Sequence, residues 1–225
     1  MEIEPIAKIY TDFPEKFGIP RQSGLAETIG RIVFEEEYRI TESVRGLDEY
    51  SHIWLIWQFS KAVRDTWSPT VRPPRLGGNK RVGVFATRSP FRPNSLGLSS
   101  VKLIKTDLSC REAPVIYASG ADLMDGTPIY DIKPYLAYTD SHQDAVCGFA
   151  DQALEHRLNA VIPDSELTKV PEEKREALIQ ILENDPRPGY QNDPDRIYKM
   201  SVMGFDIKFK VKGKEIIAEK ITNVH

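Results

Sequence analysis

Short strand-like segments dominate residues 1–132. Alternating or β-branched residues fill the stretches 3–10, 30–40, 53–59, 82–87, 98–105, 115–119 and 129–132. Such runs, separated by turn signals, are typical of strands. No amphipathic helices alternate with them, which indicates an antiparallel barrel or sandwich rather than a doubly wound parallel sheet.

The pattern changes after about residue 148. Residues 150–161 have a helical pattern, and a clearer helix opens at Pro171 and stops at Pro186, with an apolar stripe. The stripe consists of Ala177, Leu178, Ile181 and Leu182. Residues 205–211 alternate, turn at 212–214 and return through 216–218, which predicts a hairpin. We therefore expect a mainly β protein, with a small antiparallel β-barrel core at 1–140 and an α+β C-terminal extension at 141–225.

Charge is unevenly distributed along the chain. The formal net charge is −3, which argues against a protein that coats nucleic acid nonspecifically. Between Asp65 and Asp107, however, no acidic residue occurs. That stretch contains Arg72, Arg75, Lys80, Arg81, Arg88, Arg92, Lys102 and Lys105. It could bind an anionic partner locally, or it could be only a solvated face.

Several protein classes are excluded. The N-terminus lacks the features of a secretory signal and no segment is apolar enough to span a bilayer, so we expect a cytoplasmic protein without membrane contact. The four histidines have neither the spacing nor the cysteine partners of a metal site, and both cysteines are expected to be reduced. No Gly-x-Gly-x-x-Gly loop follows a strand, and the glycines at 78 and 83 lack the lysine of a P-loop.

The densest group of polar candidates lies at 83–98. Arg88 and Arg92 offer planar donor forks, Asn94 offers neutral groups, and two prolines stiffen the loop. This combination suits a polar ligand, although a hydrogen-bonded turn would use the same residues. Two further clusters at 20–22 and 122–128 could contribute, the second with carboxylates around a glycine turn.

These motifs resemble a known family. The run Gly83-Val-Phe-Ala-Thr-Arg-Ser-Pro-Phe-Arg-Pro-Asn94, with motifs at 45–47, 51–54, 72–75 and 125–135, is similar to the TsaA-like (TrmO) family over residues 1 to about 138. Asp185-Pro-Arg-Pro-Gly-Tyr190 resembles a motif of its longer bacterial members. Residues 141–183 are less similar.

The resemblance implies a homodimeric β-barrel that binds S-adenosylmethionine without a Rossmann fold. It also implies methylation of the N(6) amine of threonylcarbamoyladenosine, next to the anticodon in tRNA. The implied cofactor contacts are Pro20, Arg21, Gln22, Ser60, Lys61, Arg88, Leu98, Asp122, Asp125 and Gly126. Members of the family have His where this chain has Ser60, and Pro-Ile where it has Ser95-Leu96.

The acceptor base needs its own contacts. Asp185 could take a proton from the adenine amine while Tyr190 stacks on the base, because a delocalised amine is a weak nucleophile that gains from orientation and proton removal. Alternatively, Asp185 only lies at the C-terminal end of a helix that Pro186 stops, and Tyr190 packs in the core. The expected tRNA contacts are Arg72, Arg75, Lys80, Arg81, Arg92, Asn94 and Arg187.

Two alternatives stay open. A nonenzymatic RNA-binding barrel could use the same basic loop only to hold a backbone. A methyltransferase of this fold could also act on a different RNA acceptor.

Overall fold

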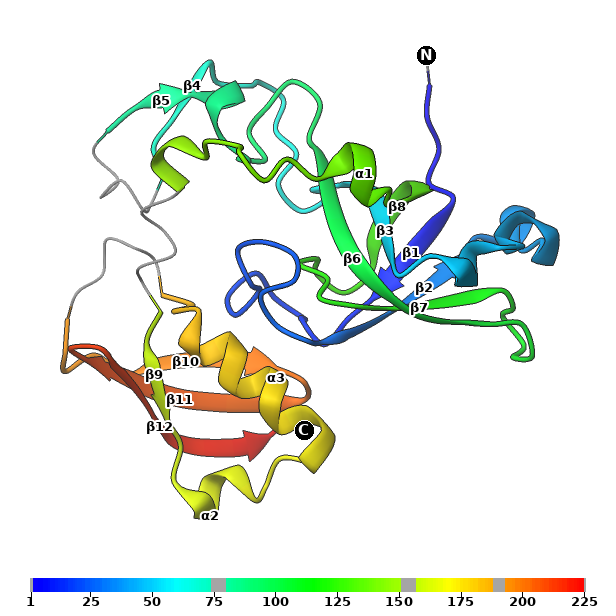
Figure 1. Ribbon diagram of the computed structural model, residues 1–225. Coiled ribbons are helices and arrows are strands. Elements are labelled where there is room, and N and C mark those ends of the chain that lie inside the picture. Colours follow the sequence, from blue (N-terminus) through cyan, green and yellow to red (C-terminus); the bar gives the residue numbers. More distant parts are fainter. Residues whose placement is uncertain (1, 74–79, 151–156, 188–192, 225) are drawn as a thin grey trace.

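Six strands close into an antiparallel barrel. The computed structural model describes residues 2–73, 80–150, 157–187 and 193–224. The barrel order is β1-β2-β7-β6-β3-β8, and the pairing of β1 with β8 closes it (Figure 1). The bounds are β1 Ala7–Tyr10, β2 Ile29–Phe34, β3 His52–Gln58, β6 Leu96–Asp107, β7 Val115–Ser119 and β8 Thr127–Pro134. The predicted mainly β fold with an antiparallel barrel is confirmed.

Side chains of alternating positions fill the barrel. In β3, Ile53, Leu55 and Trp57 are buried while their neighbours are half-buried, as the period of two in a strand requires. Trp57 pairs across the ladder with Gly97 of β6. A Cβ atom built on Gly97 would overlap the indole ring, so the absence of a side chain lets the ring lie against the neighbouring strand.

A four-stranded sheet forms the C-terminal part. Its order is β10 (Tyr198–Val202), β11 (Phe205–Lys212), β12 (Glu215–Asn223) and β9 (Asn159–Val161), with β9 parallel to β12. Helix α3 (Glu172–Glu183) packs on one face through the predicted apolar stripe (Figure 1). The predicted second helix and terminal hairpin are therefore confirmed.

Two predicted elements were of the wrong type. The expected strand at 82–87 is only β5 (Val82–Gly83), paired with β4 (Thr70–Val71), and is followed by the 3-10 turn η5 (Val84–Ala86). The turn forms because Val84 N donates to the Pro69 carbonyl and Thr87 N donates back to Val84 O. Where a helix was expected at 150–161, the described end of the segment forms the strand β9. Its partner strand, β12, is far away in the sequence. Residues 151–156 lie outside the described residues.

Five more short helices connect or flank the strands in the described part of the chain. The 3-10 turns η1 (Glu36–Tyr38), η2 (Thr41–Val44) and η3 (Leu47–Glu49) lie between β2 and β3, so the predicted strand at 30–40 stops at Phe34. The α-helices α1 (Ala137–Asp140) and α2 (Asp164–Leu167) were not predicted. A single turn carries too little periodicity to be recognised in a sequence.

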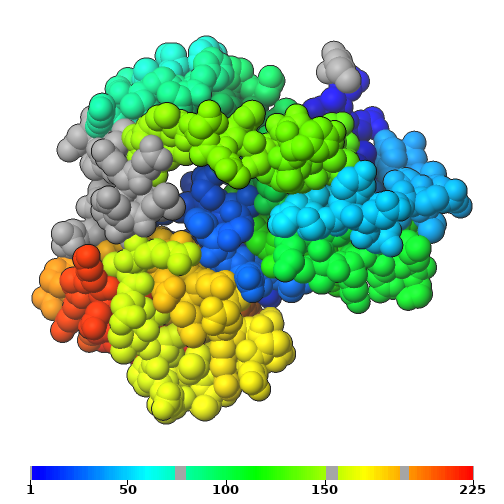
Figure 2. All heavy atoms as spheres, viewed as in Figure 1, coloured from blue at the N-terminus to red at the C-terminus, as the bar shows by residue number. Residues whose placement is uncertain are grey.

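The loop between β1 and β2 belongs to the C-terminal core. Phe13 is fully buried among residues of α3 and the four-stranded sheet, and the Phe17 ring stacks on Phe209 with centroids 6.3 Å apart. Gly18 lies so close to Met200 that an added Cβ would be 2.6 Å from its sulfur. In Figure 2 the blue atoms of this loop lie between the green barrel and the yellow-orange C-terminal part. The two parts thus share one apolar cluster.

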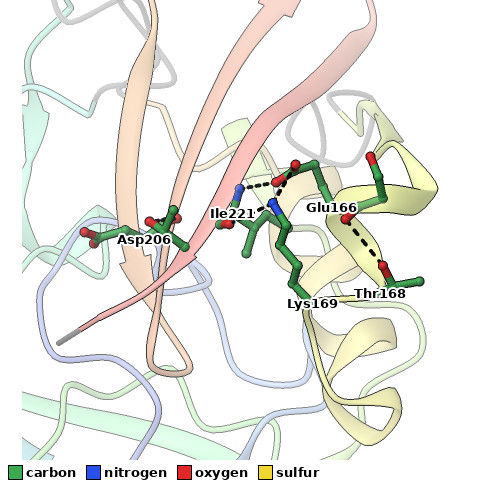
Figure 3. Close-up of polar contacts among 7 residues, drawn as sticks. Glu166, Thr168, Lys169, Asp206 and Ile221 are labelled. Atoms are coloured by element: carbon green, nitrogen blue, oxygen red, sulfur yellow. Dashed lines mark hydrogen bonds and ion pairs between the residues drawn. The ribbon is translucent and has the colours of Figure 1, made fainter.

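The α2 segment is held to β12, beyond the residues that pair with β9, by one carboxylate. Glu166 accepts hydrogen bonds from Ile221 N on β12 at 2.6 Å and from Lys169 Nζ at 2.6 Å (Figure 3). The hydrogen bond from Lys169 lowers the pKa of Glu166 most, and the bond from Ile221 N lowers it further. The N–H of Ile221 is thereby bonded to a side chain, which leaves it unavailable for pairing with another chain along this part of β12.

Gly97→Ala should destabilise the fold. The new methyl group would force the Trp57 ring or the strand to move, at a cost of about 1–3 kcal/mol in the free energy of unfolding. Gly83→Ala is the matched control, because nothing lies within 4 Å of its built Cβ and its φ of −58° suits any residue. Urea unfolding should change by less than about 0.5 kcal/mol for the control. Equal effects of the two substitutions would contradict the packing argument.

Candidate functional site

Four segments that are distant in sequence meet beside the barrel. The β1–β2 loop carries Gln22, whose Oε1 accepts a hydrogen bond from Arg88 Nη1 of the loop after β5. Arg21, next to it, donates to the carbonyl of Asp185 at 3.2 Å and to that of Arg187 at 2.5 Å. These bonds connect the predicted cofactor segment 20–22 with both the Arg88 loop and the motif that follows α3.

Asp122 is a half-buried carboxylate at this junction. Burial raises its pKa, while a hydrogen bond from Ser99 and the charge of Arg88 act in the opposite direction. Ser99 Oγ donates to Asp122 Oδ1 at 2.6 Å and accepts from Trp57 Nε1 at 3.0 Å. A chain of hydrogen bonds from the barrel core therefore orients a carboxylate that is costly to ionise.

The turn at 122–126 is bonded to the start of the β1–β2 loop. Asp125 Oδ1 accepts from Thr11 N at 2.9 Å, and Asp125 N donates to the Phe13 carbonyl at 2.9 Å. Gly126 N donates to Ile9 O, and Gly126 has a φ of +73°, which glycine adopts without strain. Asp125 and Gly126 thus position the turn that carries Asp122.

Asp185 and Arg187 form an ion pair at the end of α3. Arg187 Nε and Nη2 donate to the two oxygens of Asp185 at 2.8 and 2.9 Å, and Arg187 N adds a third bond at 3.2 Å. Arg187 is only 9% exposed, and its pKa is raised by the bond to Asp185. Asp185 has a φ of +49°, an uncommon value outside glycine that often marks a functional position. Tyr190 lies outside the described residues.

The other predicted cofactor residues lie around this junction. Pro20 is buried in the β1–β2 loop, and Leu98 is 57% exposed on β6. Ser60 and Lys61 are exposed just after β3. The Phe59 amide donates to the Ser95 carbonyl at 2.8 Å, which brings this end of β3 to the foot of the Arg88 loop.

The predicted tRNA contacts divide into two kinds. Arg72, Lys80 and Arg81 are exposed beside β4 and β5, whereas Arg75 lies outside the described residues. Arg92 is half-buried and donates to the carbonyls of Thr87 and Ser89, both at 3.3 Å. Asn94 is exposed, and its carbonyl accepts from Leu96 N. Arg92 therefore braces the loop, while the first group and the Asn94 side chain face solvent.

Sequence reasoning did not select Ser99, Trp57 or Thr11. Ser99 occupies an inward-facing position of β6 and is only 1% exposed. A polar residue at a core position of an otherwise apolar strand face is a signal that could have identified it. Thr11 gave no such signal, because its partner Asp125 is 114 residues away.

No metal site or membrane helix was found in the parts of the chain that the structure describes. No three His, Cys, Asp or Glu side chains there come together in a way that could hold a metal ion. The helices there are all too short or too polar to cross a bilayer. Cys110 and Cys147 are both free.

Comparison with known proteins gives consistent matches along the chain. The chain is 39% identical to the tRNA (adenine(37)-N6)-methyltransferase of Escherichia coli, covering 96% of this chain and 97% of that protein. It is 38% identical to a putative S-adenosylmethionine-dependent methyltransferase RcsF of Pseudomonas aeruginosa, covering 96% and 94%. A crystal structure of TrmO from Pseudomonas aeruginosa superposes with a TM-score of 0.78 at 30% identity, covering 99% of each chain.

Two family profiles match in order along the sequence. The tRNA-methyltransferase O N-terminal domain matches residues 8–141, and the TrmO C-terminal domain matches residues 155–224. Together they cover most of the chain, and the resemblance seen in the sequence motifs is confirmed. The chain belongs to the tRNA-methyltransferase O family.

Proposed function

We propose that this protein transfers the methyl group of S-adenosylmethionine to the N(6) amine of adenine 37 in tRNA. The observation that carries the proposal is the junction of Gln22, Arg88 and Asp122 with the Asp185–Arg187 pair through Arg21. It brings a polar ligand site and a candidate base-binding motif into contact. The full-length relative in Escherichia coli bears the name of this activity.

The residues present suit S-adenosylmethionine. Asp122 is a half-buried carboxylate that accepts hydrogen bonds from the neutral Ser99 hydroxyl and from its own backbone N–H, so it can still accept from an ammonium or a hydroxyl or face a sulfonium. Arg88 is bonded to a neutral amide and keeps further donors for a carboxylate or ribose. When bound, S-adenosylmethionine would supply an activated methyl group on a cationic sulfur.

The chain needs no covalent intermediate for this reaction. Its residues have to hold the acceptor nitrogen in line with the methyl carbon and exclude water, which supplies most of the acceleration in a direct displacement. Asp185 is held by Arg187 in a fixed orientation and keeps lone pairs that can accept from the adenine amine. Tyr190, outside the described residues, would stack on the base.

Further parts of the proposal concern the acceptor and the assembly. Residues 1–140 would form the cofactor-binding domain and 141–225 a domain that recognises tRNA, with threonylcarbamoyladenosine as the acceptor nucleoside. A homodimer would cover Leu98, which is 57% exposed although it belongs to the proposed cofactor contacts. A cytoplasmic location is expected for an enzyme that modifies tRNA.

Mass spectrometry of tRNA nucleosides tests the function directly. Cells that lack this protein should lose the N(6)-methylated nucleoside and regain it when the gene is restored.

Purified Arg88→Ala protein should bind S-adenosylmethionine about tenfold to a hundredfold more weakly, because the loss of a charged hydrogen bond costs about 1.5–3 kcal/mol. Arg81→Ala is the control, since Arg81 is an exposed arginine of the basic stretch. A folded protein that binds RNA but gives no calorimetric signal with the methyl donor would favour the nonenzymatic alternative, and a methylated nucleoside of another kind would favour a different RNA acceptor.

Affinity for S-adenosylmethionine should rise with pH through the raised pKa of Asp122. The ionised carboxylate attracts the sulfonium cation and the protonated carboxyl does not, so binding weakens as the pH falls below that pKa and is constant above it. S-Adenosylhomocysteine, whose sulfur is neutral, should depend less on pH. Calorimetric titrations from about pH 4 to about pH 7, below the pKa of the ligand amino group, measure both. In Asp122→Asn the dependence should vanish, and an unchanged profile in this variant would remove Asp122 from the pocket.

Asp185→Asn should reduce turnover about a hundredfold or more while affinity for the methyl donor is kept, since proton acceptance and base orientation are lost. Some stability should also be lost, because Arg187 is buried and gives up a charged partner. The control is Asp12→Asn, which breaks the 3.2 Å pair with Lys174 between the β1–β2 loop and α3. The control should melt at a lower temperature yet turn over normally per folded molecule. The same behaviour from Asp185→Asn would make the motif purely structural.

A further inference from the structure

Three lysines form a row across the open face of the C-terminal sheet. In the strand registers, Lys199 of β10 lies directly opposite Lys208 of β11, and Lys208 lies directly opposite Lys220 of β12. All three are exposed, whereas their sequence neighbours Met200, Phe209 and Ile221 belong to the core on the other face. Adjacent strands are about 4.8 Å apart, so three positive charges are placed side by side.

This arrangement costs stability in the free protein. Like charges directly opposite each other on neighbouring strands repel, and alternating signs would remove the repulsion. No ion pair involves Lys208 or Lys220 among the described residues. A polyanion on this face would turn the repulsion into attraction.

The negative groups around the row do not neutralise it. Asp206 pairs with Lys199 at 2.7 Å and accepts from Ser201 at 2.5 Å, and these bonds, with the charge of Lys208, lower its pKa. Glu166, whose pKa Lys220 lowers slightly, is already bonded to Lys169 and to Ile221 N. Figure 3 shows Asp206 on its strand apart from the contacts of Glu166.

Two more carboxylates are engaged elsewhere. Glu15 accepts from Ser201 N at the edge of β10, and Glu219 pairs with Lys210. Two positive charges of the row therefore stay uncompensated.

The row borders a hollow that could admit an anionic group. The hollow has a volume of about 230 Å³ and is lined by the three lysines with Asp206 and Thr222. Lysines supply mobile point charges without the planar fork that reads a base edge, so they suit phosphates regardless of sequence. The Thr222 hydroxyl, which donates a long 3.5 Å hydrogen bond to the Asp206 carbonyl, lies beside them.

We propose that the Lys199–Lys208–Lys220 row binds the phosphate backbone of tRNA outside the nucleotide that is methylated. This inference rests on the proposed function, which requires the protein to hold a long polyanion. It is separate from the basic stretch around Arg72 and Arg81, which lies beside β4 and β5 rather than on the C-terminal sheet. The row would act as a second electrostatic contact, carried by the C-terminal part.

The test compares two double variants of the full-length protein with an unmodified tRNA transcript as the probe. Lys208→Gln/Lys220→Gln should weaken binding about tenfold. It should also reduce the slope of log affinity against log salt concentration by about two, because two fewer phosphate contacts release counterions when the tRNA binds. Lys212→Gln/Lys214→Gln removes the same charge at the end of β11 and in the turn to β12, and neither lysine has an ion pair among the described residues. This control should keep the salt dependence within experimental error, and Lys208→Arg/Lys220→Arg should bind like the parent.

Melting temperatures show whether a loss of tRNA binding comes from a loss of stability. The glutamine pair at 208 and 220 should melt at or above the parent temperature, because repulsion is relieved. Unchanged tRNA affinity, equal losses in both glutamine variants, or a clear loss of melting temperature would each overturn the proposal. Methyl transfer at saturating tRNA should be unchanged in turnover and altered only in KM. A parent protein that binds tRNA but transfers no methyl group would instead contradict the proposed function.

Discussion

The structure depends on one apolar docking, that of the β1–β2 loop into the C-terminal core. Phe13 and Phe17 belong to the same apolar cluster as α3 and β11, and their burial removes two aromatic rings of the N-terminal part from water. Gly18 allows the approach because no side chain keeps Met200 away. The same loop carries Arg21, which donates to the carbonyls of Asp185 and Arg187 after α3.

That docking explains how a site can be built from segments so far apart in sequence. Gln22 follows the docked phenylalanines and meets Arg88, while Arg21 meets the backbone at Asp185. The cofactor side and the base-binding side of the proposed site therefore share a single short stretch of chain. Rigid support of this kind matters, because displacement by as little as 1 Å can cost a large factor in rate.

Much of the fold followed from local patterns, and the exceptions have a common cause. The strand at 115–119 and the helix after Pro171 were predicted correctly, since alternation and an apolar stripe are local properties. The turn at Val84 and the strand at Asn159 were missed because Pro69 O and β12, their partners, are distant in sequence. At the proposed site, motifs pointed to Arg88 and Asp122, whereas the Ser99 link to Trp57 depends on the pairing of β3 with β6, which brings together two residues 42 positions apart in sequence.

The shared apolar cluster also limits how this protein can be divided. A fragment that ends after the barrel would expose Phe13, Phe17 and Ile19 to water, and such a patch promotes aggregation. A fragment of the C-terminal part alone would lack the side chains that complete its own core. The halves are therefore suited to reassembly by fragment complementation, in which the loop supplied by one piece fills the hole left in the other.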